Sequence, residues 1–247
     1  MVGAPIHHTD APIHLRPTAE LAERVLLPGD PGRALALAQT LLEQPRMFNH
    51  TRGLWGYTGS ARADGAPLTI QATGMGGPSA AIVIEELIAL GARRLIRVGT
   101  CGALIDGPAL GELIVARRAI AGDGASRALS NAELLDDDRA LGDALQAAAG
   151  EHALVGAVAS CDLFYDPDPH RAEAWRGAGA LAVEMETATL FALAAAAGIA
   201  AASLLAISDL LAGERQRIDD EALVAAGERL GECAVRALNY HANPVED

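Results

Sequence analysis

Short apolar runs alternate with longer amphipathic stretches along this chain of 247 residues. The runs have the length of buried strands, and the stretches between them repeat their apolar positions with a helical period. Strands that alternate with helices are typical of βαβ units and of a mostly parallel or mixed sheet. The pattern predicts one α/β domain over residues 1–247, with strands at 24–27, 68–73, 95–98, 113–115, 153–160, 180–183 and 200–207. Helices are predicted from residue 31 and over 79–90, 184–197 and 219–238, and the acidic stretch 123–139 is expected on the surface.

Glycine and polar residues follow five of these predicted strands. Ligands of open α/β sheets bind beyond the carboxyl ends of the strands, so we expect these residues to converge on one binding site. They are Gly29–Asp30, Met75–Gly76, the stretch 97–102, the stretch 184–186, and Ser208–Asp209.

The composition limits the core and the partners. Hydrophobic residues make up 51% of the chain and aromatic residues only 3%, so the core must consist of Ala, Val, Leu and Ile. The net charge is −13, whereas proteins that bind nucleic acid or a membrane surface usually carry a basic excess. Neither of these partners is expected, and a small anion would require arginines that are gathered locally.

Neither membrane insertion nor secretion is expected. The longest apolar stretch, 191–207, is interrupted by Gly198 and predicts a buried helix that turns into a buried strand. The first seventeen residues lack the apolar core of a signal peptide. The chain has three cysteines, Cys101, Cys161 and Cys233, which are far apart and form no CxxC pair. They predict reduced thiols in a cytoplasmic protein, without a disulfide framework or a zinc site.

A metal site is not expected at the N-terminus either. His7, His8 and His14 lie near Asp10, but a terminal segment without fixed geometry predicts polar surface residues.

Two strand ends combine glycine with arginine. In the stretch 97–102, glycines allow a ligand to approach the backbone, while Arg97 and Thr100 add donors that suit a phosphate. Gly29 and Arg33 offer the same combination in the stretch 28–33. The alternatives are a strand end turned by glycines with a solvated Arg97, and an ordinary turn bounded by prolines.

The glycines of 74–77 do not form a dinucleotide fingerprint, because Ser79 occupies the position of the third glycine.

Glu184 and Glu186 begin a predicted helix, where acidic residues commonly complement the helix dipole. Alternatively, they could hold sugar hydroxyls while Met185 packs on the sugar ring. Asp209 follows a wholly apolar strand, and burial of a carboxyl group favours its protonated form, which suits a proton donor.

Taken together, these motifs resemble the nucleoside phosphorylase family that includes hexameric bacterial purine nucleoside phosphorylases and uridine phosphorylases. Each motif is weak alone, but their order and spacing are specific, and the resemblance extends from Pro12 to the C-terminal helix. The motifs are those at 27–31, 74–76, 97–102, 162–165, 183–186 and 208–209.

The resemblance implies a three-layer α/β/α sandwich with a central mixed, partly barrel-like sheet. It also implies a homohexamer, a trimer of dimers, whose active sites are shared between paired subunits. The implied phosphate site consists of Gly29, Arg33, Arg97, Val98, Gly99 and Thr100, with Arg52 reaching in from the neighbouring subunit. The implied nucleoside site consists of His14 from the neighbour with Met75, Phe164, Val183, Glu184, Met185, Glu186, Ser208 and Asp209.

The implied reaction is phosphorolysis of nucleosides in salvage, with inorganic phosphate as co-substrate and without a cofactor or a metal. Asp209 resembles the proton donor to a purine base, and an arginine after it would assist. Arg215 is the candidate and Arg217 the alternative, although both could instead be solvated helix charges. Thr100 departs from the family, because the purine enzymes often have serine there.

Three other functions remain open. The pyrimidine branch reads uracil with a glutamine and an arginine, but the stretch 164–171 contains no glutamine, which favours purines. A hydrolase of thioadenosine nucleosides should lack the arginines of a phosphate site. A nucleoside-binding protein without catalysis would not need Asp209. Preference for 6-amino or 6-oxo purines is not indicated.

Overall fold

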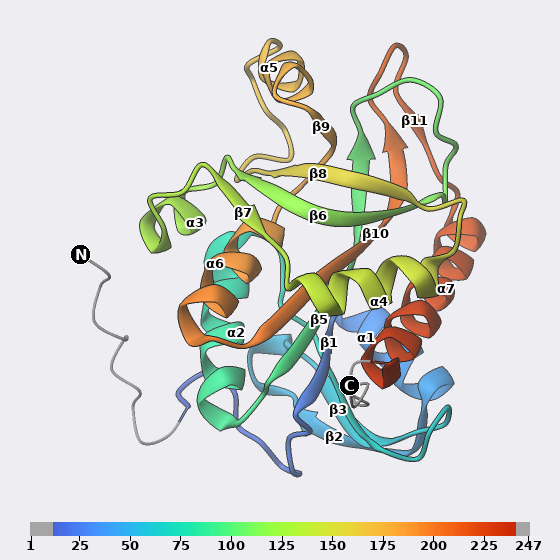
Figure 1. Ribbon diagram of the computed structural model, residues 1–247. Coiled ribbons are helices and arrows are strands. Elements are labelled where there is room, and N and C mark those ends of the chain that lie inside the picture. The colour runs from blue at the N-terminus through green and yellow to red at the C-terminus, as the bar shows by residue number, and fades with distance from the viewer. Residues whose placement is uncertain (1–11, 241–247) are drawn as a thin grey trace, which may run out of the picture.

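The computed structural model describes residues 12–240, so His7, His8 and Asp10 lie outside the described residues. Strands and helices alternate along this part of the chain (Figure 1). The strands are β1 (Arg24–Leu27), β2 (Leu42–Asn49), β3 (Gly56–Ala61), β4 (Pro67–Gln71), β5 (Arg94–Ala103), β6 (Leu113–Ala121), β7 (Leu134–Asp136), β8 (Leu154–Ser160), β9 (Ala180–Glu184), β10 (Ala200–Leu210) and β11 (Gln216–Arg217). The helices are α1 (Pro31–Leu41), α2 (Gly77–Leu90), α3 (Gly124–Leu129), α4 (Arg139–Ala149), α5 (Arg171–Gly177), α6 (Thr187–Ala197) and α7 (Asp220–Tyr240), with a 3₁₀ turn, η1, at Thr51–Gly53.

The sheet is mixed and partly closed. Its strand order is β11-β10-β6-β8-β9-β5-β1-β4-β3-β2, and β10 also pairs in parallel with β5. This additional pairing closes β10, β6, β8, β9 and β5 into a ring, while β1 to β4 continue as an open sheet beyond β5. The predicted mixed, partly barrel-like sheet is confirmed.

Helices cover two sides of the sheet. One apolar cluster joins α2 and α6 to β5, β6 and β10, and a second joins α1, α4 and α7 to the other side of the same strands. The stretch 191–207 is the end of α6, a turn at Gly198 in the left-handed region (φ 64°), and β10. None of the helices within 12–240 combines the length and the apolar character needed to cross a membrane.

Two local predictions need correction. The hairpin of β2 and β3 was not predicted, because the middle of β2 is exposed and lacks a buried alternation. The stretch 123–139 is not wholly on the surface: Asp123 and Ser126 are fully buried at the start of α3. There the Asp123 carboxylate accepts the Ser126 N–H at 2.8 Å and the Thr189 hydroxyl at 3.0 Å, so it caps α3 and ties that helix to α6.

The topology brings the predicted strand ends together. β1 lies in parallel between β4 and β5, and β5 lies in parallel beside β10, so these four carboxyl ends share one side of the sheet. β9 runs antiparallel to β5 and ends opposite the last residues of that strand, with Val183 facing Gly102. Every strand end that the sequence singled out therefore reaches the same region.

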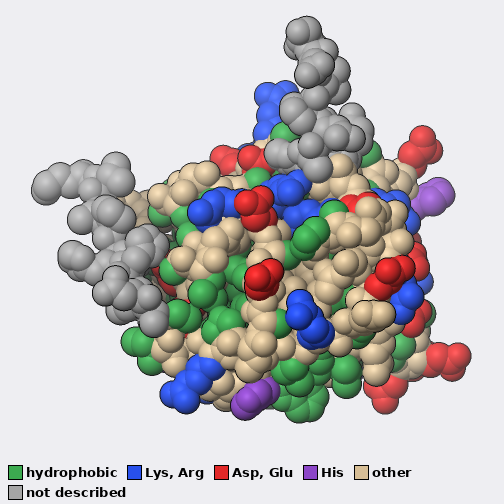
Figure 2. Space-filling view, turned by 90° about the horizontal axis from the view of Figure 1, so that it is seen from below, with side chains coloured by type: hydrophobic (Ala, Val, Ile, Leu, Met, Phe, Trp, Pro, Cys, Tyr) green, Lys and Arg blue, Asp and Glu red, His purple; other side chains and the backbone are tan. Residues whose placement is uncertain are grey.

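Charged side chains of both signs are spread over the face of the molecule that Figure 2 shows. On the face seen in Figure 2, acidic and basic side chains lie in small separate groups with hydrophobic side chains between them. The described residues on this face form no continuous basic patch, in keeping with the net charge of −13.

Candidate active site

A cavity of about 580 Å³ opens where these strand ends meet. Its size suits a small-molecule ligand. Most of the predicted site residues line it: Gly29, Arg33, Met75, Arg97, Gly99, Thr100, Phe164, Val183, Glu184, Met185, Glu186, Ser208, Asp209 and Arg215.

Two arginines and close-packed backbone mark one end of the cavity. The Arg33 guanidinium has no hydrogen-bond or ion-pair partner among the described residues. Burial lowers the pKa of Arg33, and the charge of Arg97 lowers it further, while Asp30 acts in the opposite direction. At Gly99 an added Cβ would lie 2.7 Å from the guanidinium carbon of Arg97, so glycine is needed there. Arg33 at this end therefore makes no direct ion pair among the described residues, whereas Arg97 beside it pairs with two carboxylates.

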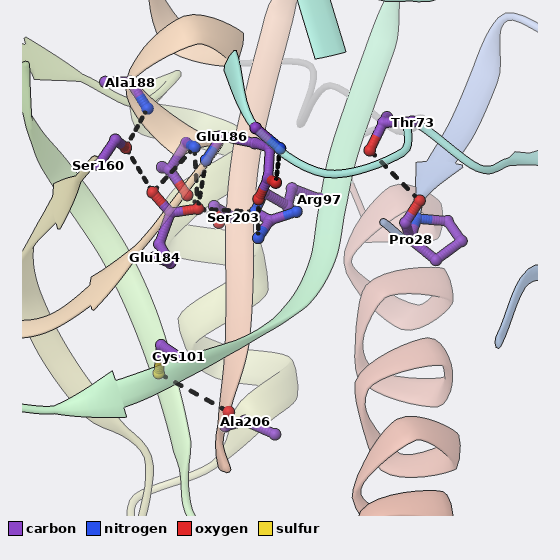
Figure 3. A network of polar contacts seen from close by, with 12 residues as sticks. Pro28, Thr73, Arg97, Cys101, Ser160, Glu184, Glu186, Ala188, Ser203 and Ala206 are labelled. Carbon is purple, nitrogen blue, oxygen red and sulfur yellow. Dashed lines mark hydrogen bonds and ion pairs between the residues drawn. The ribbon is translucent and has the colours of Figure 1, made fainter. Parts of the chain in front are cut away.

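Arg97 is buried between two carboxylates (Figure 3). Its Nε donates to Glu184 Oε2 at 2.9 Å, and its Nη2 lies 2.5 Å from Glu186 Oε2. Burial works against the charge of Arg97, but Glu186 and Glu184 outweigh this effect and raise its pKa. The other oxygen of Glu186 accepts the backbone N–H of Gly76. Burial and the neighbouring Glu184 raise the pKa of Glu186, while Arg97 acts in the opposite direction.

Glu184 has more partners than Glu186, and all of them are protein groups. Its Oε1 accepts the Ser160 hydroxyl, and its Oε2 accepts the N–H of Glu186 at 2.9 Å. The N–H of Thr187 lies 3.0 Å from both oxygens. Glu184 thus caps the first turn of α6 while it contacts Arg97, and its side chain has no exposed surface. These contacts differ from the predicted contact with a nucleoside.

Asp209 stands opposite Gly102, further along β5 than Arg97, and so marks the other end of the cavity. β10 shifts its register against β5 between Ile207 and Asp209, and such bulges redirect a side chain. The Ser208 hydroxyl donates to Asp209 Oδ2 at 2.9 Å. Arg215 reaches Oδ1 through Nη2 at 2.8 Å and through Nε at 3.1 Å, while Arg217 reaches Oδ2 at 3.3 Å. Asp209 is only 4% exposed, so a buried carboxylate lies between two arginines.

Apolar groups border Asp209. The guanidinium carbon of Arg215 lies 5.4 Å from the centre of the Phe164 ring, which is a cation–π contact. Val183 and Leu211 belong to one apolar cluster and also line the cavity. The arrangement can therefore hold an anion at one end and a flat, partly apolar group beside a carboxyl group at the other.

The family model described as the phosphorylase superfamily matches residues 23–239. The chain belongs to the phosphorylase superfamily. This finding confirms the likeness that the sequence motifs indicated.

Curated members of the superfamily match most of the chain. A purine nucleoside phosphorylase DeoD-type of Geobacillus kaustophilus is 40% identical over 210 residues, which cover 82% of this chain and 88% of the relative. A protein of the same name from Clostridium perfringens is 38% identical over 210 residues, with the same coverage. Another from Exiguobacterium sp. is 40% identical over 204 residues, which cover 79% of this chain and 84% of the relative.

Three predicted residues do not line the cavity of this phosphorylase-superfamily chain. The Val98 side chain is fully buried in an apolar cluster, so it belongs to the core. Arg52 is exposed in η1, with its backbone in the left-handed region (φ 60°). His14 binds Glu86 through Nδ1 at 2.7 Å. Neither Arg52 nor His14 serves the cavity of its own chain.

The segments that carry His14 and Arg52 are joined to each other. The Arg16 N–H donates to Asn49 Oδ1 at 3.0 Å, and the Asn49 side chain also donates to the Leu54 carbonyl at 2.6 Å. The Glu86 carboxylate additionally accepts the backbone N–H groups of residues 13–15. Both predicted neighbour-facing residues therefore lie on one anchored surface.

Arg215 and Arg217 both contact Asp209, although the sequence left the choice between them open. Neither lies on a helix: Arg217 belongs to β11, which pairs with β10 so that Arg217 stands opposite Asp209, and Arg215 precedes it. Arg215 makes the shorter contacts, and it lines the cavity. The alternative of solvated helix charges is wrong.

One wall of the cavity was not predicted from the sequence. Ala172 and Trp175 of α5 line it, as do Asp166 and Arg171, whose carboxylate oxygen and Nε lie 2.8 Å apart. The spacing of Ala172 and Trp175 by three positions puts both on one side of a helix, and this was the available signal. Within 12–240, no cluster of three or more His, Cys, Asp or Glu side chains could hold a metal ion.

Proposed function

We propose that this chain is a purine nucleoside phosphorylase, which transfers the ribosyl or deoxyribosyl group of a purine nucleoside to inorganic phosphate. One observation carries the proposal: a single cavity combines the unpartnered guanidinium of Arg33, beside Arg97, with the buried Asp209 at its other end. The names of the relatives support the same activity.

The arginine end of the cavity would hold the phosphate. Arg33 supplies a charge that the protein leaves unpaired, and Arg97 supplies a guanidinium whose plane is fixed by two glutamates. Gly29 also lines this end, where a residue without a side chain would let the phosphate approach the backbone. Binding in a fixed position converts attack by phosphate on the sugar into a nearly unimolecular step.

The Asp209 end would hold the base. Positive charge develops on the sugar as its bond to the base breaks, as in the hydrolysis of glycosides. The bonding electrons leave with the base, and a proton from Asp209 neutralises them, while phosphate forms the new bond to the sugar. General acid catalysis of this kind accelerates a reaction by roughly 10²–10⁴-fold. Arg215 and Arg217 then stabilise the carboxylate that remains.

The sugar would lie between these ends. Glu186 has one oxygen on Gly76 and the other on Arg97, so it would stand between the phosphate and the nucleoside and accept sugar hydroxyls. Met75 is 83% exposed at the rim and Met185 lines the cavity, so both offer apolar contact to the ring.

The active site would be shared between paired subunits of a homohexamer. His14 and Arg52 do not line the cavity of their own chain as far as the described residues show, and the nearby Ile13 and Trp55 are exposed apolar residues. A Cβ on Gly74, at the rim of the cavity, would lie 3.3 Å from Leu54, so this surface adjoins the cavity. Mixed hexamers of inactive His14→Ala and inactive Asp209→Ala chains should regain activity. Inactive mixtures that have demonstrably co-assembled would contradict sharing.

The same reading extends to the cellular role. Phosphate supplies the nucleophile, Asp209 the proton and the arginines the charge, so we expect an enzyme without a cofactor or a metal. We also expect it to act in nucleoside salvage in the cytoplasm. Full activity in the presence of a strong chelator is the corresponding test.

The experiment that tests the function is an assay of base release from adenosine, inosine, guanosine, uridine and methylthioadenosine, with and without phosphate. The proposal predicts release from purine nucleosides only when phosphate is present. Equal release without phosphate would indicate a hydrolase, preference for uridine would indicate the pyrimidine branch, and retention of nucleosides without turnover would indicate a binding protein. The ratio of adenosine to inosine turnover gives the preference for 6-amino or 6-oxo purines.

A further inference from the structure

Glu184 differs from the other carboxylates that border the cavity. It has no exposed side-chain surface, although Arg97 beside it lines the cavity. Its two oxygens accept from Ser160, Glu186, Thr187 and Arg97, so their lone pairs are fully used by the protein. No acceptor capacity is left for a sugar hydroxyl.

Glu184 contacts Arg97 at Nε, the atom whose N–H direction sets the orientation of the guanidinium. A guanidinium is planar, and the direction of its Nε–H fixes the plane and the directions of the other N–H groups. Glu184 accepts the Nε–H, and Glu186 forms an ion pair with Nη2. Nη1 makes no hydrogen bond to another described residue. The two N–H groups of Nη1 and the remaining one of Nη2 therefore stay available for a ligand.

Glu184 itself is held by groups of two elements, α6 and β8. The first turn of α6 donates two backbone N–H groups to it, from Glu186 and Thr187. The Ser160 hydroxyl at the end of β8 donates to Oε1, and the Ser160 oxygen accepts the N–H of Ala188 at 2.8 Å (Figure 3). These contacts link Arg97 on β5 to β8 and to α6.

We propose that Glu184 is a positioning residue, which holds Arg97 in the orientation that binds the phosphate co-substrate and does not itself touch the nucleoside. The proposal rests on the proposed function for the identity of the anion. Without the Glu184 carboxylate, Arg97 would turn toward Glu186 and form a two-pronged ion pair, which uses the donors that phosphate needs.

The direction in which phosphate binding changes when Glu184 loses its charge distinguishes positioning of Arg97 from simple charge repulsion. Glu184 carries a negative charge close to the anion site, so removal of that charge alone should strengthen phosphate binding. Loss of the Arg97 orientation should weaken it. Glu184→Gln removes the charge and keeps the size of the side chain, so the two explanations predict changes in opposite directions.

The experiment compares Glu184→Gln with Asp123→Asn in steady-state kinetics and in crystal structures. Asp123 is a matched control, since it is a fully buried carboxylate that caps a helix but contacts no guanidinium and does not line the cavity. For Glu184→Gln we expect the KM for phosphate to rise by about tenfold or more, because a charge-assisted hydrogen bond that orients Arg97 is lost. The KM for the nucleoside and kcat at saturating phosphate should stay close to the parent values. Asp123→Asn should leave the KM for phosphate unchanged.

Ser160→Ala provides a second variant in case Glu184→Gln folds poorly. It keeps the carboxylate but removes one of its anchors, so it should produce a smaller rise in the KM for phosphate. An unchanged or lower KM for phosphate in folded Glu184→Gln would overturn the proposal. Equal losses of kcat in Glu184→Gln and Asp123→Asn, without a change in the KM for phosphate, would also overturn it and leave Glu184 as a helix cap.

A crystal structure of ligand-free Glu184→Gln decides the positioning role independently of turnover. The proposal predicts that Arg97 lies against Glu186 through two nitrogens, whereas an Arg97 in the parental position would contradict it. A parent protein that cleaves no nucleoside would refute the proposed function, and this structure would still test the positioning of Arg97.

Discussion

The two ends of the cavity are built from the same groups in opposite proportions. At the phosphate end one buried arginine, Arg97, lies between the carboxylates of Glu184 and Glu186. At the base end one buried carboxylate, Asp209, lies between Arg215 and Arg217. In each cluster the central group is nearly inaccessible to solvent: Arg97 is 5% exposed and Asp209 is 4% exposed.

The flanking groups differ in burial. The side chains of Glu184 and Glu186 are 0% and 7% exposed, whereas those of Arg215 and Arg217 are 49% and 59% exposed. Pairing of buried charges is required for stability, since an unpaired buried charge is costly, while an exposed ion pair contributes little. The phosphate end should therefore couple function tightly to folding, and the base end should allow its chemistry to be changed with little effect on stability.

Arg97→Ala should have the largest effect, because it removes the central charge of the buried cluster. Two carboxylates then remain buried without a counter-ion, which should lower the free energy of unfolding by about 3–5 kcal/mol. The KM for phosphate should also rise strongly, since a charge-assisted hydrogen bond contributes about 1.5–3 kcal/mol. Urea denaturation and phosphate kinetics measure the two effects. An Arg97→Ala protein with parental stability would remove the distinction between the two ends.

Asp209→Asn tests the opposite case, a loss of chemistry without a loss of folding. The variant preserves shape but cannot supply an acidic proton, so turnover of ordinary purine nucleosides should slow by about 10²-fold or more. 7-Methylguanosine should lose much less, because its base is already cationic and leaves without a proton. Parallel rate measurements on guanosine and 7-methylguanosine provide the comparison. Equal losses for both substrates would indicate that Asp209 only binds the base.

Arg33→Met separates phosphate binding from stability within the phosphate end. Arg33 has no anion partner among the described residues, and burial lowers its pKa, so the fold gains little from its charge. The KM for phosphate should rise by about tenfold or more, from the loss of one charge-assisted hydrogen bond. The free energy of unfolding, measured beside that of Arg97→Ala, should stay at or above the parental value. A loss of stability as large as that of Arg97→Ala would show that Arg33 has a protein partner.

Arg215→Ala and Arg217→Ala should have the smallest effects, because both arginines are about half exposed. Arg215 makes the shorter contacts with Asp209, so its loss should lower kcat by about fivefold, as expected for an interaction of about 1 kcal/mol. Arg217→Ala is the matched control and should change kcat by less than about twofold. A loss of kcat in Arg215→Ala that clearly exceeds that in Arg217→Ala, at unchanged stability, would support Arg215 as the arginine that assists Asp209. A larger loss in Arg217→Ala would assign that role to Arg217.

Much of this comparison could be predicted from the sequence, since the glycine and polar residues after apolar strands indicated where the cavity lies. The partners within each cluster could not. Ser160 and Arg97 meet Glu184 from far along the chain, and only the pairing of β5, β8 and β9 brings them together. The contacts of Arg215 and Arg217 with Asp209 depend on the pairing of β10 with β11, a strand of 2 residues that is too short to leave a periodic signal.

The edge of the sheet was also difficult to predict. β2 has an exposed middle and β3 contains glycines, so their hairpin carries neither an apolar run nor a clear alternation. The anchoring of His14 depends on Glu86, which lies on α2 and showed no sign of this role in the sequence. The predictions of one domain over 1–247, of a hexamer and of the roles of the individual site residues stay predictions.

³¹P NMR of the reaction tests most directly whether the cavity joins phosphate to a sugar while it releases a purine. The protein is incubated with inosine or adenosine and a known amount of inorganic phosphate. For phosphorolysis we expect the phosphate signal to fall and a sugar 1-phosphate signal to rise in equal amount, in step with the release of free base. Release of base with an unchanged phosphate signal and the appearance of free ribose would contradict it.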